Sequence, residues 1–185
     1  MISVELVDEV NEDIINGILE IYKTYYNSSK TEFDFLYFRS FYKKVLTDSK
    51  STLFLLKNEN NILGYIYGIP QNIIFPELVR FDPEIKYSSN NYYVDSLEVR
   101  RNCGNVFGFL RLIKNIVNEA TKKGFYIFSM YTRSEITHRL INILLKEVAD
   151  NIEIKRTIKG NWYGTEELYD YLEVTVRQII KKRFL

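Results

Sequence analysis

Residues 92 to 131 constrain the fold of this chain more than any other segment. Alternating and apolar residues from Tyr92 to Val99 predict a strand, and Val106 to Thr121 repeats apolar residues with the period of a helix. Gly124 predicts the end of that helix, and Tyr126 to Tyr131 predicts the next strand. The helix residues expected to face inward are Phe109, Leu112, Ile113, Ile116, Val117 and Ala120. A strand, a loop, a helix and a strand in direct succession indicate an α/β chain.

Further elements are expected before this unit. Ile2 to Leu6 alternates like a strand, and Asp8 or Asn11 is placed to cap the helix that follows it. A second helical pattern runs through Phe35, Phe38, Tyr42, Val45 and Leu46. Residues 51–56 and 62–67 flank a polar turn, which predicts an antiparallel hairpin.

The three prolines Pro70, Pro76 and Pro83 fall in the stretch up to Asn91, which predicts a long surface connection. After the central unit, Ile136 to Val148 predicts a helix, and residues 152–158 and 168–176 predict strands. The expected order is therefore β-α-α-β-β-β-α-β-α-β-β.

Composition excludes several classes of protein. The chain has 185 residues, of which 46% are hydrophobic, so residues 1–185 are expected to form a single domain. Its 25 Lys and Arg residues against 24 Asp and Glu residues leave no field that would attract nucleic acid. One cysteine, Cys103, and one histidine, His138, are too few for a zinc site. We expect no metal, no signal peptide, no membrane-spanning segment and a cytoplasmic location.

The element order, together with the segment Tyr93-Val94-Asp95-Ser96-Leu97-Glu98-Val99-Arg100-Arg101-Asn102-Cys103-Gly104, resembles the GNAT family of acyl-CoA N-acyltransferases. The resemblance covers nearly the whole chain and implies a mixed, mostly antiparallel central sheet flanked by helices. The segment looks like the family's fourth strand running into its pyrophosphate loop. Arg101, Gly104 and Val106 occupy the family's loop spacing, with valine where members carry glycine or alanine.

The resemblance implies acetyl-CoA or another acyl-CoA as cosubstrate. The residues it assigns to that site are Leu97, Val99, Arg101, Asn102, Cys103, Gly104, Asn105 and Val106. Backbone N–H groups that converge at a helix N-terminus bind pyrophosphate well, and glycine lets the backbone approach the phosphates. Gly104→Glu is therefore predicted to abolish CoA binding. Arg111 and Lys114 fit a solvated helix face better than a phosphate contact.

Transfer to an amine requires a base, and the resemblance favours Asp95 over Glu98 for that role. Period-two alternation predicts that Tyr93, Asp95, Leu97 and Val99 share one face of the strand, with Val94, Ser96 and Glu98 on the other. The alternative for Asp95 is a structural role, in which its carboxyl caps or hydrogen-bonds a neighbouring loop.

The acid that protonates the leaving thiolate is less clear in the sequence. The residues from His138 to Leu145 align with the family's acid motif, and they place leucine where members commonly carry tyrosine. A proton could instead come from His138, from Tyr131 or Ser134, or from water.

Aromatic residues suggest an acceptor cleft for an amine carried by a small molecule or a protein. They are Tyr25, Tyr26, Phe33, Phe35, Tyr37, Phe38, Tyr42, Trp162 and Tyr163, and core packing is the competing explanation for those at helical spacing. The resemblance also implies a possible homodimer, and we expect no nucleic-acid or membrane partner. The alternative to an enzyme is a non-catalytic GNAT-like module that binds acyl-CoA or another protein, which Leu145 and Val106 favour.

Overall fold

The computed structural model describes residues 2–26, 39–40, 43, 46, 48–59, 61–100, 106–143, 145–160 and 166–176. Its strands are β1 (Ile2–Leu6), β2 (Thr52–Asn58), β3 (Asn61–Pro70), β4 (Asn91–Val99), β5 (Ile127–Arg133), β6 (Ala149–Gly160) and β7 (Glu167–Val176). Its helices are α1 (Glu12–Tyr26), α3 (Gln71–Phe81), α4 (Val106–Lys122) and α5 (Ser134–Ile143), with a 3-10 turn over Leu145–Glu147. None of the helices described is long and apolar enough to cross a membrane.

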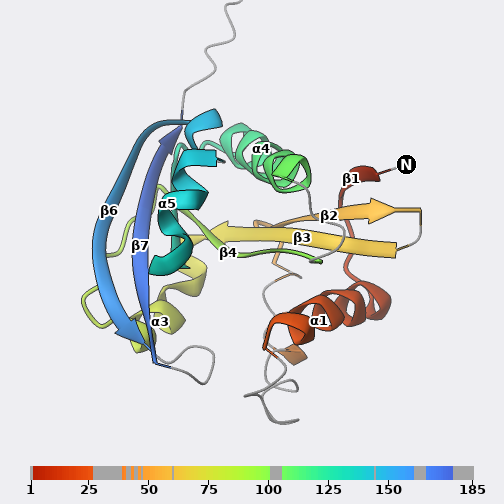
Figure 1. Ribbon diagram of the computed structural model, residues 1–185, viewed down its shortest axis with the longest axis horizontal. Helices are drawn as coiled ribbons and strands as arrows, with labels where there is room; N and C mark the ends of the chain where they lie inside the picture. The colour runs from red at the N-terminus through yellow and green to blue at the C-terminus, as the bar shows by residue number, and fades with distance from the viewer. Residues whose placement is uncertain are drawn as a thin grey trace, which may run out of the picture.

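All seven strands lie in one sheet, in the order β1-β2-β3-β4-β5-β7-β6 (Figure 1). Every neighbouring pair is antiparallel except β4 and β5, which are parallel and are joined through α4. The expected mixed, mostly antiparallel sheet flanked by helices is confirmed. The hairpin expected between residues 51 and 67 is also confirmed as β2 and β3.

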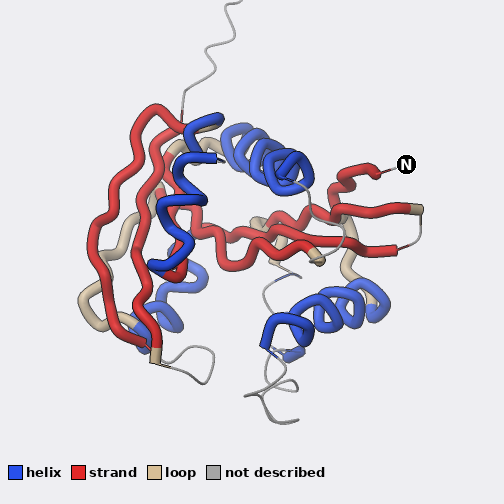
Figure 2. Tube along the Cα trace, in the orientation of Figure 1, coloured by secondary structure: helices blue, strands red, loops and turns tan. Residues whose placement is uncertain are grey.

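Two apolar cores cover the two faces of the sheet. One core packs α1 and α3 against residues such as Leu55, Tyr67 and Tyr93. The other packs α4 and part of α5 against residues such as Tyr92 and Leu172. Figure 1 shows α1 and α4 on opposite sides of β2 and β3, and the tube in Figure 2 traces the same layers. The inward residues expected on α4 are confirmed, because all six contribute to the second core.

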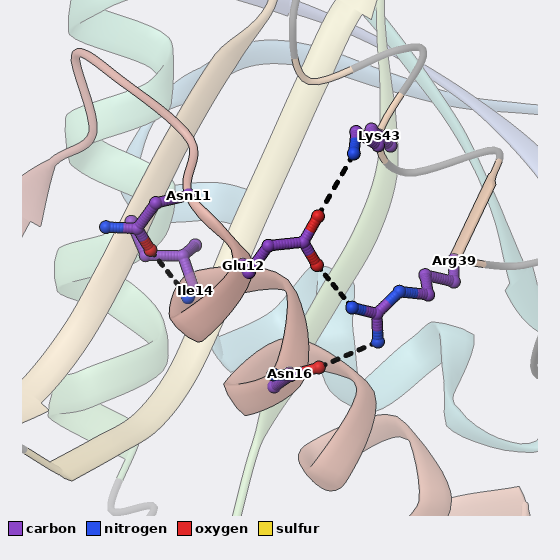
Figure 3. Close-up of polar contacts among 6 residues, drawn as sticks. All are labelled: Asn11, Glu12, Ile14, Asn16, Arg39 and Lys43. Carbon is purple, nitrogen blue, oxygen red and sulfur yellow. Dashed lines mark hydrogen bonds and ion pairs between the residues drawn. The ribbon is translucent and has the colours of Figure 1, made fainter.

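Helix α1 begins where the sequence places a cap. Asn11 Oδ1 accepts a hydrogen bond from the backbone N–H of Ile14 at 3.0 Å, which satisfies one of the free donors of the first turn. The Glu12 carboxylate binds Arg39 and, at 3.0 Å, Lys43 (Figure 3). Arg39 also donates to Asn16 at 2.8 Å. These contacts attach the helical residues Arg39 and Lys43 to the start of α1.

The long surface connection expected between Pro70 and Asn91 is wrong in its first half, which forms α3. Gln71, Ile74 and Leu78 are buried on one face of this helix, so its apolar spacing outweighs the prolines. Pro70 precedes the first turn, where no N–H is required of it. Pro76 removes one hydrogen bond inside the helix, but it lies on the exposed side, where water can satisfy the freed carbonyl.

The other helical expectations agree with the structure to different degrees. The helix expected over residues 136–148 spans Ser134–Ile143 and gives way to the 3-10 turn, after which β6 begins at Ala149. Gly124 adopts a φ of 92°, which confirms it as the end of α4. In the helix expected over residues 35–46, the described positions 39, 40, 43 and 46 are helical, and the others lie outside the described residues.

Candidate functional site

The sheet separates between β4 and β5. These parallel strands pair through only three positions, from Asn91 opposite Ile127 to Tyr93 opposite Ser129. Beyond Tyr93, β4 continues for six residues, to Val99, and pairs with β3 as its one strand neighbour in the described part of the chain. One backbone edge of β4 is therefore available to a ligand from Val94 onward.

A β-bulge lies at the start of this open stretch. Gly68 pairs with Val94 and Tyr67 pairs with Ser96, so Asp95 is an additional residue that has no opposite position on β3. The bulge shifts the alternation, and the expected separation of Asp95 and Glu98 onto opposite faces is wrong. Both carboxylates face the side of α1 and α3, where they contact the tyrosines of β3.

The Asp95 carboxyl lies in a partly buried position among hydroxyl groups. The hydroxyl of Ser96 donates a hydrogen bond to Asp95 Oδ2 at 3.1 Å, and the buried Tyr67 side chain lies beside it. Loss of water raises the pKa of Asp95 above its ordinary value of 3.8, and the two hydroxyls counteract only part of that rise. Both of these partners belong to strands, Ser96 to β4 and Tyr67 to β3.

Glu98 follows on the same face, closer to the end of β4. Its Oε2 accepts a hydrogen bond from the hydroxyl of Tyr65 at 3.0 Å, and the Tyr65 ring is fully buried. Leu97 and Val99 point to the opposite face, where they pack into the core under α4. The side chains of Leu97 and Val99 therefore hold β4 in place, while its backbone lies along the open edge.

A buried polar cluster closes the base of this opening. The hydroxyl of Ser129 on β5 donates to Asn91 Oδ1 on β4 at 2.9 Å, and both residues belong to the short stretch in which the two strands pair. Gln71 donates to the hydroxyl of Tyr171 at 3.1 Å and accepts from the backbone N–H of Ser88 at 2.8 Å. These groups are almost fully buried, so the cluster fixes the point at which the two strands part.

The candidate acids Tyr131 and Ser134 have different hydrogen-bond partners. Tyr131 lies on β5, on the same face as Asp95, but its hydroxyl donates to Asp82, which also binds Arg156 at 2.6 Å. Burial, followed by the bond to Asp82, raises the pKa of Tyr131 far above its ordinary value. The hydroxyl of Ser134 donates to Asp170 Oδ1 at 2.8 Å.

His138 is not brought to the same place. It is exposed on α5 and interacts electrostatically with Asp170 of β7. By strand alternation, Asp170 shares the face of Leu172 and Val174, which belong to the core under α4. Asp95 and Glu98 face the other side of the sheet. Leu145 is 2% exposed in the core under α4 and α5, so that position is a packing residue.

Most of the expected cofactor loop, Arg101 to Gly104 with Asn105, lies outside the described residues, and Val106 is described only as the first residue of α4. The neighbouring cations have other contacts. Arg100 pairs with Glu20 at 3.1 Å, Arg111 donates to the carbonyl of Ile2 at 3.0 Å, and Lys114 lies 3.6 Å from Glu147. No group of three or more His, Cys, Asp or Glu side chains in the described ranges is arranged to hold a metal ion.

The sequence did not single out Tyr65 and Tyr67 as site residues. Their alternation in Gly64-Tyr65-Ile66-Tyr67 predicts one shared face, but only the pairing register reveals that this face meets the carboxylates of β4. Of the aromatic residues proposed for the acceptor cleft, Tyr25 and Tyr26 are described only as part of α1. The side chains of the others lie outside the described residues.

Solved structures share this fold. The ribosomal-protein-S18-alanine N-acetyltransferase of Escherichia coli aligns with a TM-score of 0.66 and 8% identity, over 100% of both chains. An aminoglycoside 6'-N-acetyltransferase complexed with coenzyme A aligns at 0.64 and 10% identity, over 95% of this chain and 98% of the other. The NatC complex bound to Gag peptide and CoA aligns at 0.64 and 13% identity, over 95% and 99%. No family model matches the sequence, and no curated protein matches it.

Proposed function

We propose that this chain transfers an acyl group, in particular an acetyl group, from acyl-CoA to an amine, and that the amine attacks the thioester directly. The chain has the fold of the GNAT acetyltransferases, which supports this proposal. The observation that carries this proposal is the position of Asp95. Its carboxyl lies at the bulge where β4 leaves β5, and burial raises its pKa.

A carboxylate with a raised pKa is a better base near neutral pH than an ordinary aspartate. In the proposed reaction, Asp95 accepts a proton from the incoming ammonium group. The amine then attacks the thioester carbonyl, the new C–N bond forms, and the C–S bond breaks. Glu98, held by Tyr65 on the same face, adds a second carboxylate that favours a cationic acceptor.

The residues present suit CoA in two respects. The open edge of β4 from Val94 to Val99 offers backbone donors and acceptors to the amides of the pantetheine arm. Helix α4 begins at Val106, directly after a sequence segment that contains Arg101 and Gly104, and has no acidic residue in its first turn. The partial positive charge of that helix end therefore favours the pyrophosphate.

After the attack, the nitrogen still carries one proton more than the amide product. We propose that this proton passes to water and that the departing thiolate takes a proton from water, so that the products are the amide and the CoA thiol. Tyr131 already donates its hydroxyl proton to Asp82, and His138 belongs to the other face of the sheet. A thiol has a pKa of about 8.5, so the thiolate can leave near neutral pH without a dedicated acid.

Calorimetric titration with acetyl-CoA and with CoA tests the cosubstrate. Wild type and Asp95→Asn are expected to bind both ligands alike, and Gly104→Glu is expected to bind neither. Asn90→Glu, which adds the same charge to an exposed residue at the other end of β4, serves as the matched control and should bind like wild type. Equal affinity of Gly104→Glu and wild type would refute the phosphate loop.

A second candidate, the non-catalytic module, rests on Leu145. The leucine is part of the core, so the position of the family's tyrosine supplies no proton donor here. A panel of amines incubated with radiolabelled acetyl-CoA separates the two candidates. Acylation of any amine that is lost in Asp95→Asn supports the enzyme, and tight acetyl-CoA binding without acylation of any amine supports the module.

A further inference from the structure

A cleft of about 500 Å³ lies at the end of β4 where the sheet is closed, away from the open edge. Its lining includes Ser49, Lys50, Asn72, Tyr87, Lys123 and Phe125. These residues come from the segment before β2, from α3, from the loop before β4 and from the segment after α4. The open edge of β4 begins at Val94, three residues along the strand from Asn91 and about 10 Å away at 3.3 Å per residue, and none of the residues that line the cleft belongs to that edge. The cleft is therefore separate from the proposed acyl-CoA site.

The cleft presents two cations that no described carboxylate neutralises. Neither Lys50 nor Lys123 forms an ion pair within the part of the chain that the structure describes. The Lys123 ammonium is held in place, because it donates to Thr52 Oγ1 at 2.9 Å and to the carbonyl of Ser51 at 3.4 Å. An ammonium with only neutral partners keeps its full charge for a ligand.

The acidic groups nearby have other contacts. Asp48 Oδ1 accepts from the backbone N–H of Lys50 at 2.8 Å, and Glu119 pairs with Lys122 at 2.8 Å. Neither carboxylate lines the cleft. The charged side chains that line the cleft are therefore both lysines.

Aromatic rings supply an apolar wall. The Tyr87 side chain is 55% exposed, yet its ring is held edge-on against Phe75 with centroids 5.3 Å apart. Phe125 packs on the buried Tyr92 with centroids 5.1 Å apart. Rings that are both fixed and accessible offer a flat apolar surface at little entropic cost. A purely ionic site would not need such a surface.

The first turn of α3 adds a smaller contribution. It begins after Pro70, which gives no side-chain cap, and contains no acidic residue. Asn72 of this turn lines the cleft. The free N–H groups of the turn therefore favour negative charge on the same side as the two lysines.

From these features we infer that the cleft binds a small organic anion whose phosphate or carboxylate group is attached to a planar apolar body. The anionic group contacts Lys50 and Lys123, and the planar body lies against Tyr87 and Phe125. Ser49 and Ser89 contribute hydroxyl groups at the rim. This site does not depend on acyl transfer, so it stands or falls separately from the proposed enzyme.

Titrations of the ¹⁵N-labelled full chain with phenyl phosphate and with benzoate test this site. We expect saturable shifts in the backbone amides of Lys50, Asn72 and Tyr87 with at least one of the two anions, and the tighter one identifies the anionic group. Inorganic phosphate, which lacks the ring, and benzyl alcohol, which lacks the charge, should each bind at least about fivefold more weakly. The double variant Lys50→Gln/Lys123→Gln should lose about tenfold in affinity, since exposed charge pairs contribute modestly.

Lys86→Gln removes an exposed lysine of the same loop that does not line the cleft, and it should bind like wild type. The amide spectrum of the double variant checks that it remains folded, and if it does not, each single variant replaces it with an expected loss of about threefold. The site is overturned if no cleft amide shifts with either anion, if the lysine variants bind like wild type, or if Lys86→Gln weakens binding equally. Acetyl-CoA titrations of the same variants should be unchanged, which separates this result from the test of the enzyme.

Discussion

The two halves of β4 differ more than any other adjoining segments of the molecule. From Asn91 to Val94 every side chain is buried, and Tyr92 and Tyr93 pair with strands on both sides. From Asp95 to Glu98 the side chains are only partly buried, the strand bulges, and β5 has turned away. A single nine-residue strand thus serves as core at one end and as site at the other.

The difference explains why the carboxylates lie where they do. In the closed half, polar groups such as Asn91 and Ser129 satisfy one another inside the sheet. In the open half, Asp95 meets the hydroxyls of Ser96 and Tyr67 and Glu98 meets that of Tyr65, and these groups solvate a carboxylate less well than water does. The ionised form of the Asp95 carboxyl is therefore destabilised in the open half, where the proposed chemistry uses it. The closed half, from Asn91 to Val94, contains no charged side chain.

The largest expected effect is on turnover in the open half. Asp95→Asn should lower kcat by about 10²- to 10⁴-fold, since it removes the proposed base, and leave the affinity for acetyl-CoA unchanged. Steady-state kinetics with an acceptor found in the amine panel measure this. Asp8→Asn, an exposed aspartate before α1, is the matched control. A larger loss in Glu98→Gln than in Asp95→Asn would reverse the assignment of the base.

A substitution in the closed half of β4 is expected to change the stability of the fold. The hydroxyl of Tyr92 lies 2.8 Å from both Thr52 Oγ1 and the carbonyl of Gly68, and the ring is fully buried. Tyr92→Phe removes a buried hydrogen-bonding hydroxyl, although Thr52 Oγ1 keeps its bond from Lys123, and should lower the free energy of unfolding by about 1–3 kcal/mol. Denaturant unfolding measures this, with Tyr87→Phe on the exposed loop as control. An unchanged midpoint for Tyr92→Phe would contradict the closed half as described.

The pH dependence of stability provides a sharper comparison. The folded-state pKa of Asp95 is raised by burial, so ionisation of this group costs stability as pH rises through its unfolded-state value. Asp95→Asn should therefore unfold at a higher temperature than wild type at pH 7, and this advantage should shrink toward pH 3. Thermal unfolding at both pH values tests the sign. A variant that is less stable than wild type only at pH 7 would mean that the carboxylate is stabilised in the fold.

The smallest effect is expected at the start of α1. Lys43, followed by Arg39, lowers the pKa of Glu12, so its contribution is present above the unfolded-state pKa and is lost as pH falls through the folded value. Glu12→Gln should destabilise the fold only slightly at pH 7, because the pair is exposed, and not at all at low pH. Glu9→Gln is a control without such partners in the described contacts. A pH-independent loss would indicate packing instead of charge.

Sequence patterns identified most of the fold because each pattern is local. The inward face of α4, the hairpin of β2 and β3, and the end of α4 at Gly124 all follow from periodicity or turn chemistry. Helix α3 differs from the expectation because Pro70, Pro76 and Pro83 indicate a loop, whereas burial of Ile74 and Leu78 on one face stabilises a helix. In that helix, burial compensates for one missing hydrogen bond.

The arrangement of the candidate site depends on the β-bulge at Asp95, which the periodicity of the sequence does not predict. The strand that contains Asp95 is predicted by its pattern, but a bulge adds one residue to β4 and moves Glu98 to the same face. Tyr65 and Tyr67 became visible only through the register of β3 with β4. Pairing between segments some thirty residues apart is a tertiary property, and alternation within one strand does not specify it.

The most direct test of the account is a titration of the ¹⁵N-labelled chain with acetyl-CoA, followed at the backbone amides of β4. The account predicts saturable shifts at Val94, Ser96 and Glu98, with little change at Asn91 and Tyr92. Absence of binding, or shifts confined to the closed half, would contradict the assignment of the open edge of β4 to acyl-CoA.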